Sequence, residues 1–118
     1  MLKTWVQPLN EKNYPDVKRL GVNDTLTIKK MKHVSVGDTV IIYLAKPSAI
    51  IKYVGVVSND NATGEDPSCR FYTININTVF SDDDLRVQLH ELKDHFFHAQ
   101  PLIHLADSRL CEYLGIAL

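Results

Sequence analysis

The chain has 118 residues, of which 45% are hydrophobic, and this length suits one domain with a sizeable core and leaves no room for two. Its 13 lysine and arginine residues against 14 aspartate and glutamate residues give a formal net charge of −1, which argues against a protein that holds nucleic acid by a global basic field. A local basic patch stays open. No apolar run approaches the roughly 20 residues that cross a bilayer, and the N-terminus has no signal-peptide pattern. We therefore expect a single cytoplasmic domain over residues 1–118, without a membrane partner.

The first third of the chain predicts one strand, a short helix and an arm. Residues 4–9 (TWVQPL) form a short apolar run that is stopped by Pro8, which is typical of a first strand. Asn10 is a candidate N-cap for a short helix that ends at Gly21. Residues 23–36 carry β-branched residues and then three lysines, which indicates a short strand or an irregular arm.

The middle of the chain predicts two strands joined by a tight turn. Residues 39–45 (TVIIYLA) are nearly continuous in apolar and β-branched residues, as in a strand buried on both faces. Pro47 breaks this run, and residues 49–57 (AIIKYVGVV) predict the second strand. Gly55 within that strand indicates a bulge or a sharp bend. Residues 58–68 are dense in turn formers and predict a loop.

The last third predicts one further strand and then mainly helices. Residues 69–80 alternate between apolar and polar side chains, which predicts a strand with one wet face. Residues 81–96 predict a helix capped by Ser81, residues 96–106 a final strand, and residues 107–118 a closing helix. Strands therefore dominate the first two thirds, and helices attach at the edges. This order predicts an α+β domain built round a partly open, mixed β-barrel of about five to six strands.

No sequence motif predicts an enzyme. The chain lacks GxSxG, HExxH, P-loop and GxGxxG patterns, and no nucleophile has an obvious partner. A histidine cluster at His90, His95 and His98 fits a solvated helix face better than a metal site, and capping of a helix explains the acidic run 82–84. The cysteines Cys69 and Cys111 lack metal-ligand spacing and predict free thiols in a reducing compartment. We expect no catalytic residue, no metal and no cofactor.

Aromatic residues at strand ends favour a binding module instead. Trp5 begins the first predicted strand, and Tyr43 and Tyr53 bracket the turn between the next two. An aromatic ring stacks on any base and contributes roughly 1–3 kcal/mol per stacked base. The alternative for each ring is ordinary core packing.

Polar and basic side chains near these rings complete the predicted site. Directional hydrogen bonds to a base edge are expected from Gln7, Asn10 and Ser48. Phosphate contacts are expected from four lysines, although a short lysine run also serves solubility alone. These lysines are Lys29, Lys30, Lys32 and Lys46.

Three stretches together resemble the EVE branch of the PUA-like superfamily. They read W-V-Q-P-L-N, V-x-V-G-D-T-V-I-I-Y and S-A-I-I-K-Y-V-G-V-V, in family order over residues 3–58. The resemblance implies a partly open barrel related to YTH and ASCH domains. Members of that group are nucleic-acid readers, several of which flip a base carrying an N6-methyl or 5-methyl group into an aromatic pocket. Some EVE-like domains are the DNA-reading part of McrB-type, modification-dependent restriction systems.

The resemblance also assigns roles to positions. Trp5 matches the leading tryptophan of the family, Tyr43 the aromatic residue that ends the GD strand, and Ser48 the small polar residue of the next turn. Relatives carry a further aromatic residue after the first helix, where this chain has residues 25–28. Leu26 or Ile28 would then supply an apolar wall in its place.

We therefore expect a PUA-like, EVE-type module that reads an extruded base, methylated or not, in an open slot between Trp5 and Tyr43. DNA is favoured over RNA as the polymer, and further domains or subunits of a restriction or RNA-processing assembly are expected as partners. Two alternatives stay open, a single-stranded RNA-binding PUA-like or ASCH-like module and a small-molecule or protein-interaction domain. An ASCH-like hydrolase ranks last, because no catalytic pair is present.

Overall fold

The computed structural model describes residues 3–10, 12–14, 17–29, 34–45, 49–62, 70–81, 83–84, 87–88 and 103–116. Six strands form one sheet, a 3-10 turn follows the first strand, and an α-helix lies near the C-terminus. In chain order the elements are β1 (Thr4–Leu9), η1 (Val17–Arg19), β2 (Thr25–Lys29), β3 (Thr39–Leu44), β4 (Ile50–Ala62), β5 (Arg70–Val79), β6 (His104–Leu105) and α2 (Ser108–Leu114).

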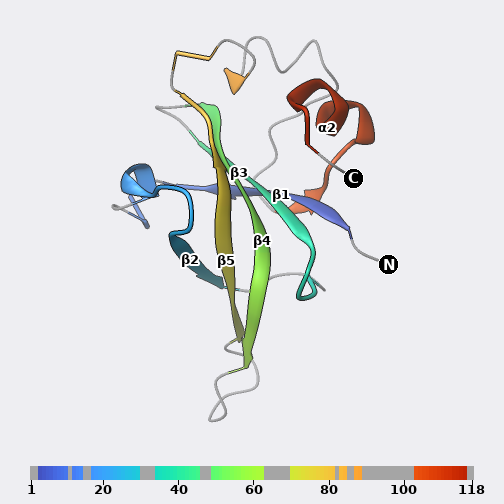
Figure 1. Ribbon diagram of the computed structural model, residues 1–118. Helices are drawn as coiled ribbons and strands as arrows, with labels where there is room; N and C mark the ends of the chain where they lie inside the picture. The colour runs from blue at the N-terminus through green and yellow to red at the C-terminus, as the bar shows by residue number, and fades with distance from the viewer. Residues whose placement is uncertain are drawn as a thin grey trace.

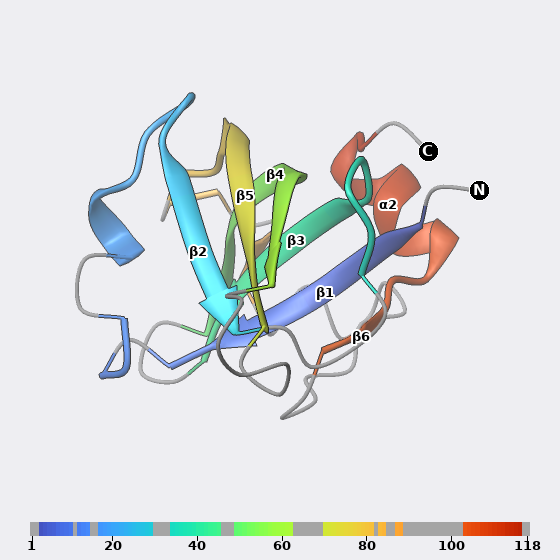
Figure 2. The same cartoon turned by 90° about the horizontal axis from the view of Figure 1, so that it is seen from below.

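The sheet is mixed and strongly curled. Its strand order is β2-β5-β4-β3-β1-β6, with β1 and β3 parallel and the other neighbours antiparallel. Seen end-on, the strands turn round a common interior, and the sheet does not close into a barrel (Figures 1 and 2). The predicted α+β class, the mixed sheet and the strand number are confirmed. The opening lies where β2, at one end of the strand order, faces β1 near the other end (Figure 2).

The core lies inside the curl, and β3 lies within the sheet between β4 and β1. Every residue of β3 after Thr39 is buried, which confirms the prediction of a strand covered on both faces. In β5 the side chains of Tyr72, Ile74 and Ile76 are buried, and the intervening Asn75 is exposed. The predicted period of two for this strand is therefore confirmed.

Gly55 lies where the side chain of Ile74 and the backbone of Asn75 leave no room for a Cβ atom on β4. The pairing of β4 and β5 shifts register between Val54 and Gly55, in agreement with the bulge that this glycine predicted. A Cβ atom at position 55 would lie against the side chain of Ile74 and 2.7 Å from the carbonyl oxygen of Asn75. Only glycine fits at this position.

Three element predictions need correction. Strand β4 extends to Ala62, so the first five residues of the predicted loop 58–68 belong to a long hairpin with β5. Pairing with the partner strand overrides the turn-forming composition there. Between Asn10 and Gly21 the described residues form only η1, and of the strand predicted over residues 96–106 the described part forms only β6.

Helix α2 confirms the predicted closing helix. Asp107 caps it by accepting a hydrogen bond from the backbone N–H of Arg109, and Gly115 ends it in the left-handed conformation with φ of 73°. Cys111, on the buried side of α2, is a free thiol, and Cys69 lies outside the described residues. The helix predicted over residues 81–96 lies mostly outside them too. No helix in the described ranges is long and apolar enough to span a membrane.

Candidate functional site

The three aromatic residues of the predicted slot lie in the core. Trp5 is 7% exposed, Tyr43 is 4% exposed and Tyr53 is fully buried. A ring that neighbouring side chains cover offers no face for stacking, so the open slot expected between Trp5 and Tyr43 is a wrong prediction. Apolar packing inside the curled sheet explains why all three rings turn inward.

Asp38, the acidic residue of the GD pair, explains the position of Trp5. Its carboxylate accepts hydrogen bonds from the indole Nε1 of Trp5 at 3.0 Å, from the backbone N–H of Lys3 at 2.9 Å and from that of Ser35 at 3.0 Å. Burial alone would raise the pKa of Asp38, but the hydrogen bonds from Ser35, Lys3 and Trp5 outweigh it and lower this pKa below its usual value. The GD pair therefore fixes the start of β1 to the start of β3.

Gln7 also has an internal role. Its side-chain Oε1 accepts a hydrogen bond from the hydroxyl of Tyr72 at 2.8 Å, and its Nε2 donates to the carbonyl oxygen of Pro8 at 3.0 Å. Gln7 is 7% exposed and Tyr72 is fully buried. The expectation that Gln7 reads the edge of a base is therefore wrong, because its amide is engaged inside the protein.

The other predicted contacts divide between the surface and the undescribed part of the chain. Asn10 is exposed, and its Oδ1 accepts a hydrogen bond from the backbone N–H of Lys12, which closes a turn after β1. Lys29 ends β2. Ser48 and the remaining predicted lysines lie outside the described residues, so their assignments stay predictions. They are Lys30, Lys32 and Lys46.

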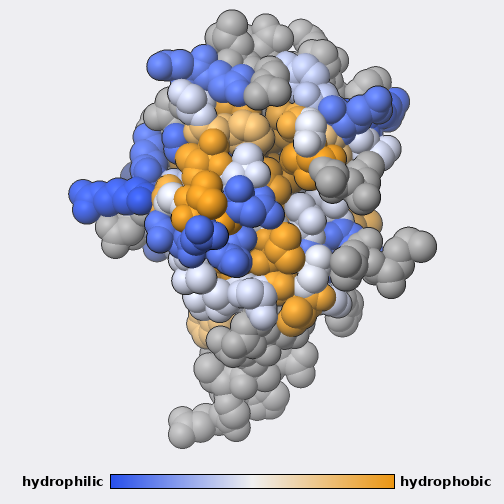
Figure 3. All heavy atoms as spheres, viewed as in Figure 1, coloured by the Kyte–Doolittle hydropathy of each residue, from blue (hydrophilic) through white to orange (hydrophobic). Residues whose placement is uncertain are grey.

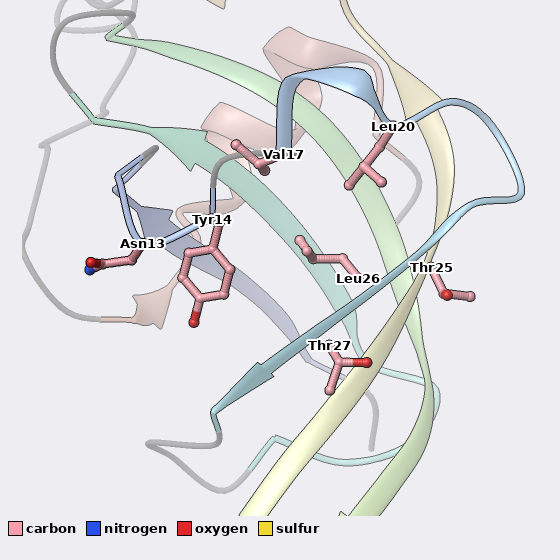
Figure 4. Close-up of a pocket in the computed structure, with 7 residues that line it drawn as sticks. All are labelled: Asn13, Tyr14, Val17, Leu20, Thr25, Leu26 and Thr27. Carbon is pink, nitrogen blue, oxygen red and sulfur yellow. The ribbon is translucent and has the colours of Figure 1, made fainter.

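A different site lies at the open side of the curled sheet, between η1 and β2. It is a surface pocket of about 310 Å³, which we call the β2 cleft (Figure 4). This volume falls at the lower end of the roughly 300–1,000 Å³ of small-ligand pockets. The lining residues are Asn13, Tyr14, Val17, Leu20, Thr25, Leu26 and Thr27.

The β2 cleft combines an apolar floor with one aromatic wall. Val17 and Leu26 are buried, Leu20 and Tyr14 are half-buried against the same core, and these side chains come together between the two elements (Figure 4). Of the two residues suggested as an apolar wall of the predicted slot, Leu26 lines this different pocket and Ile28 does not. Sequence reasoning missed Tyr14 because it stands in a turn-forming stretch, NEKNYPD, that was assigned to a helix. An aromatic residue among turn formers was the available signal.

The open edge of β2 adds directional polar groups to the cleft. Within the described part of the chain β2 pairs with β5 alone, and the backbone N–H of Ile76 donates to the carbonyl oxygen of Asp24. Since the hydrogen-bonding direction alternates along an antiparallel strand, Leu26 and Ile28 bond toward β5. The backbone N–H and C=O groups of Thr25 and Thr27 consequently point to the free edge, where the cleft lies. One short strand thus presents both donors and acceptors to a ligand.

Exposed basic residues flank the cleft. Lys18 and Arg19 are the exposed members of η1, directly between the lining residues Val17 and Leu20. Sequence reasoning had assigned the basic rim to the lysines after β2 and had not considered this pair.

A second pocket, of about 370 Å³, lies between the sheet and α2. Phe80 lines it together with aliphatic side chains, and the hydroxyl of Thr78 donates to Oδ1 of Asn77 at 2.9 Å, so two of its polar groups satisfy each other. Its aromatic residue, Phe80, is only 7% exposed, and the strands that line this pocket pair on both sides, whereas Tyr14 is half-buried beside a strand at the end of the sheet order. Among the described residues, no group of three histidine, cysteine or acidic side chains is placed to hold a metal ion.

Comparison with known proteins identifies the fold. Three solved structures align with nearly the whole chain. The ASCH protein of Zymomonas mobilis gives a TM-score of 0.63 at 9% identity over 96% of this chain and 94% of that one. A single-substitution variant of the same protein gives 0.64 at 10% identity, with coverage of 96% and 94%. The protein Rpa0253 of Rhodopseudomonas palustris gives 0.63 at 10% identity, with coverage of 97% and 94%.

The chain has an ASCH-like fold. The predicted likeness to ASCH domains is thus confirmed for the fold. No family model and no curated protein matches the sequence. Only about one residue in ten is identical between this chain and these structures, so the likeness concerns the arrangement of the strands. The chemistry of the cleft must be argued from this chain's own residues.

Proposed function

We propose that this ASCH-like domain binds nucleic acid by holding one unstacked base in the β2 cleft. The observation that carries the proposal is the combination of the Tyr14 ring, an apolar floor and the free backbone edge of Thr25 and Thr27 in one pocket. A base is a flat, mostly uncharged ligand with a π-face and a polar edge. The cleft offers one partner for each of these two features.

The two parts of the cleft act differently on such a ligand. Stacking on Tyr14 is tolerant of sequence because every base has a π-face, and it contributes roughly 1–3 kcal/mol. The backbone groups of β2 discriminate, because a base that mismatches their donors and acceptors leaves buried polar groups unpaired. A methyl group on the base would contact the apolar floor at Leu26.

Phosphate binding is assigned to basic residues on either side of the cleft. Lys18 and Arg19 lie on η1, and Lys29 ends β2, with Lys30 and Lys32 following it in the sequence. Each phosphate contact releases counterions, so affinity falls as salt rises. A net charge of −1 does not conflict with this assignment, because basic residues on one face of a protein are enough to attract a nucleic acid to that face.

The proposal keeps the finer predictions in a testable form. We propose a binding function without catalysis. The assignment to the EVE type, within the PUA-like fold, is also a proposal. Asn10 would shape the turn that presents Tyr14. Reading of an extruded, modified base in duplex DNA, as in a restriction system, requires a few kcal/mol of unpairing that stacking must return. Single-stranded RNA or DNA supplies the base without that cost.

A titration of labelled oligonucleotides followed by fluorescence anisotropy tests the proposal. The set contains single-stranded RNA, single-stranded DNA and duplex DNA, with unmodified, N6-methyl and 5-methyl bases, each at two salt concentrations. We expect salt-dependent binding of at least one class. Tyr14→Ala should weaken it roughly 5- to 150-fold, which corresponds to the loss of one stacked base.

Two variants make the test specific. Tyr14→Phe keeps the ring and should retain most of the affinity, whereas Tyr113→Ala removes a half-buried tyrosine on α2 and should bind as the wild type does. Silence of the wild-type protein toward every oligonucleotide at low salt would overturn the proposal and favour a small-molecule or protein ligand. Equal losses for Tyr14→Ala and Tyr113→Ala would show that the cleft is not the site.

A further inference from the structure

The outer face of β2 and β5 has a composition that the fold does not require. Its side chains are Thr25 and Thr27 from β2 and Phe71, Thr73 and Asn75 from β5. All are exposed except Thr73, which is half-buried, while the alternate residues of both strands face the core. We call this set the β2–β5 outer face.

The chemistry of this face suits the flat, uncharged bases of a nucleic acid. None of its five side chains is charged, and four of them carry a hydroxyl or an amide. Lys29, at the end of β2, pairs with Phe71 in the register. Phe71 is 36% exposed and is the one aromatic ring among them. The hydroxyls of Thr27 and Thr73 lie 3.3 Å apart across the two strands. Hydrogen-bonding side chains around an exposed aromatic ring are what sheet surfaces use to bind the bases of single strands.

The outer face is continuous with the β2 cleft. Thr25 and Thr27 line the cleft, and they stand directly opposite Asn75 and Thr73 on the neighbouring strand. Phe71 follows two positions beyond Thr73, on the same side of β5. A chain that leaves the cleft therefore reaches Phe71 by crossing a single strand.

We infer that the β2–β5 outer face carries the nucleotides next to the base held in the β2 cleft, with Phe71 as a second stacking platform. This assignment rests on the proposed function. The occupant is a single-stranded nucleic acid, since a paired and stacked duplex exposes no base face to Phe71. A protein partner would need a contiguous apolar centre. Of the five side chains of this face only Phe71 is apolar. Figure 3 shows one side of the molecule, where hydrophilic residues interrupt the hydrophobic ones.

The chain offers a matched pair of variants for the test. Phe71 and Val79 lie on the same strand, and they are 36% and 38% exposed. Val79 pairs with Tyr53 at the other end of β5, away from the face. Phe71→Ala and Val79→Ala therefore remove similar exposed apolar groups, and only the first removes the platform.

The experiment compares a dinucleotide with a single strand of about ten nucleotides, by anisotropy or NMR titration. For the longer strand, Phe71→Ala should weaken binding at least about fivefold, and Val79→Ala should not. For the dinucleotide, which occupies the cleft alone, Phe71→Ala should bind as the wild type does, and Tyr14→Ala should lose both ligands. Thermal unfolding of both alanine variants confirms that they fold equally.

The outcomes separate the two assignments. If Phe71→Ala and Val79→Ala bind the longer strand equally while Tyr14→Ala weakens it, the outer-face assignment is overturned and the cleft stands. If the wild type binds neither ligand, both fall. If Phe71→Ala instead changes the oligomeric state in light scattering and leaves oligonucleotide affinity intact, the face binds a second copy of the chain, and the assignment to nucleic acid is wrong.

Discussion

The hydroxyl of Tyr72 donates a 2.8 Å hydrogen bond to Oε1 of Gln7 inside the curled sheet. Tyr72 lies on β5 and Gln7 on β1, and the strands β4 and β3 separate these two in the sheet order. The bond therefore crosses the interior and holds together two strands that do not pair. Burial and, to a smaller extent, Tyr14 of the β2 cleft raise the pKa of Tyr72.

Tyr72→Phe should lower the free energy of unfolding by about 1–3 kcal/mol, because it leaves the buried Oε1 of Gln7 without its donor. Urea denaturation measures this change. The double variant Tyr72→Phe with Gln7→Met removes both partners and should recover part of the loss. If Tyr72→Phe is as stable as the wild type, the hydrogen bond does not contribute to folding.

Alkaline pH should destabilise the fold through the same tyrosine. Burial, followed by the neighbouring Tyr14, raises the pKa of Tyr72 above its ordinary value of about 10. A group whose pKa is higher in the folded state stabilises the fold below the unfolded-state pKa, and this contribution is lost as the pH rises above it. The free energy of unfolding should therefore fall above about pH 10.

Tyr72→Phe provides the comparison for this pH dependence. Its free energy of unfolding should decline less steeply above about pH 10 than that of the wild type. Some decline remains, since burial raises the pKa of Tyr43 as well. Identical alkaline profiles for the two proteins would show that Tyr72 ionises as freely in the folded state as in the unfolded one.

The sequence predicted the central strands well because local patterns determine them. The apolar run of β3 and the alternation of β5 directly indicate which side chains are buried. Gly55 indicates the register shift between β4 and β5. The end of β4 was missed because the hairpin with β5 is stabilised by long-range pairing, which composition does not reveal.

The site was harder to predict, because burial of an aromatic ring depends on tertiary contacts. Trp5 looked like a stacking residue, but its indole meets Asp38, which stands 33 positions later in the chain. Tyr14 looked unremarkable in a turn-forming stretch, and its value as a wall appears only when η1 lies across the edge of β2. Leu26, one of the two residues suggested as an apolar wall, lines the β2 cleft and thus a different pocket from the predicted slot.

Trp5→Phe should separate stability from binding. It removes the Nε1–H that donates to the Asp38 carboxylate and leaves a small cavity, so the free energy of unfolding should drop by about 2 kcal/mol or more. Because Trp5 is only 7% exposed, oligonucleotide affinity at a temperature where the variant is folded should equal that of the wild type. A loss of affinity as large as that of Tyr14→Ala would restore Trp5 to the binding site.

Asp38→Asn should change the acid stability of the protein. Hydrogen bonds that outweigh the effect of burial lower the pKa of Asp38 in the folded state, so its carboxylate stabilises the fold above the unfolded-state pKa, near 4, and this contribution disappears as the pH falls below it. The stability difference between wild type and Asp38→Asn should accordingly be large at neutral pH and shrink in acid. A difference that stays constant from neutral to acid pH would contradict the lowered pKa.

Thr27→Pro tests whether the free edge of β2 reads the ligand. Proline removes the outward N–H at position 27, and since Leu26 and Ile28 make the bonds to β5, the ladder should survive. Thr27→Ala keeps the N–H and loses the same contact with Thr73, so the two variants differ only in the backbone group and its rigidity. We expect Thr27→Pro to bind oligonucleotides about tenfold or more weakly than Thr27→Ala, at similar melting temperatures. Equal affinities would show that the base is held by stacking alone, without recognition by the strand edge.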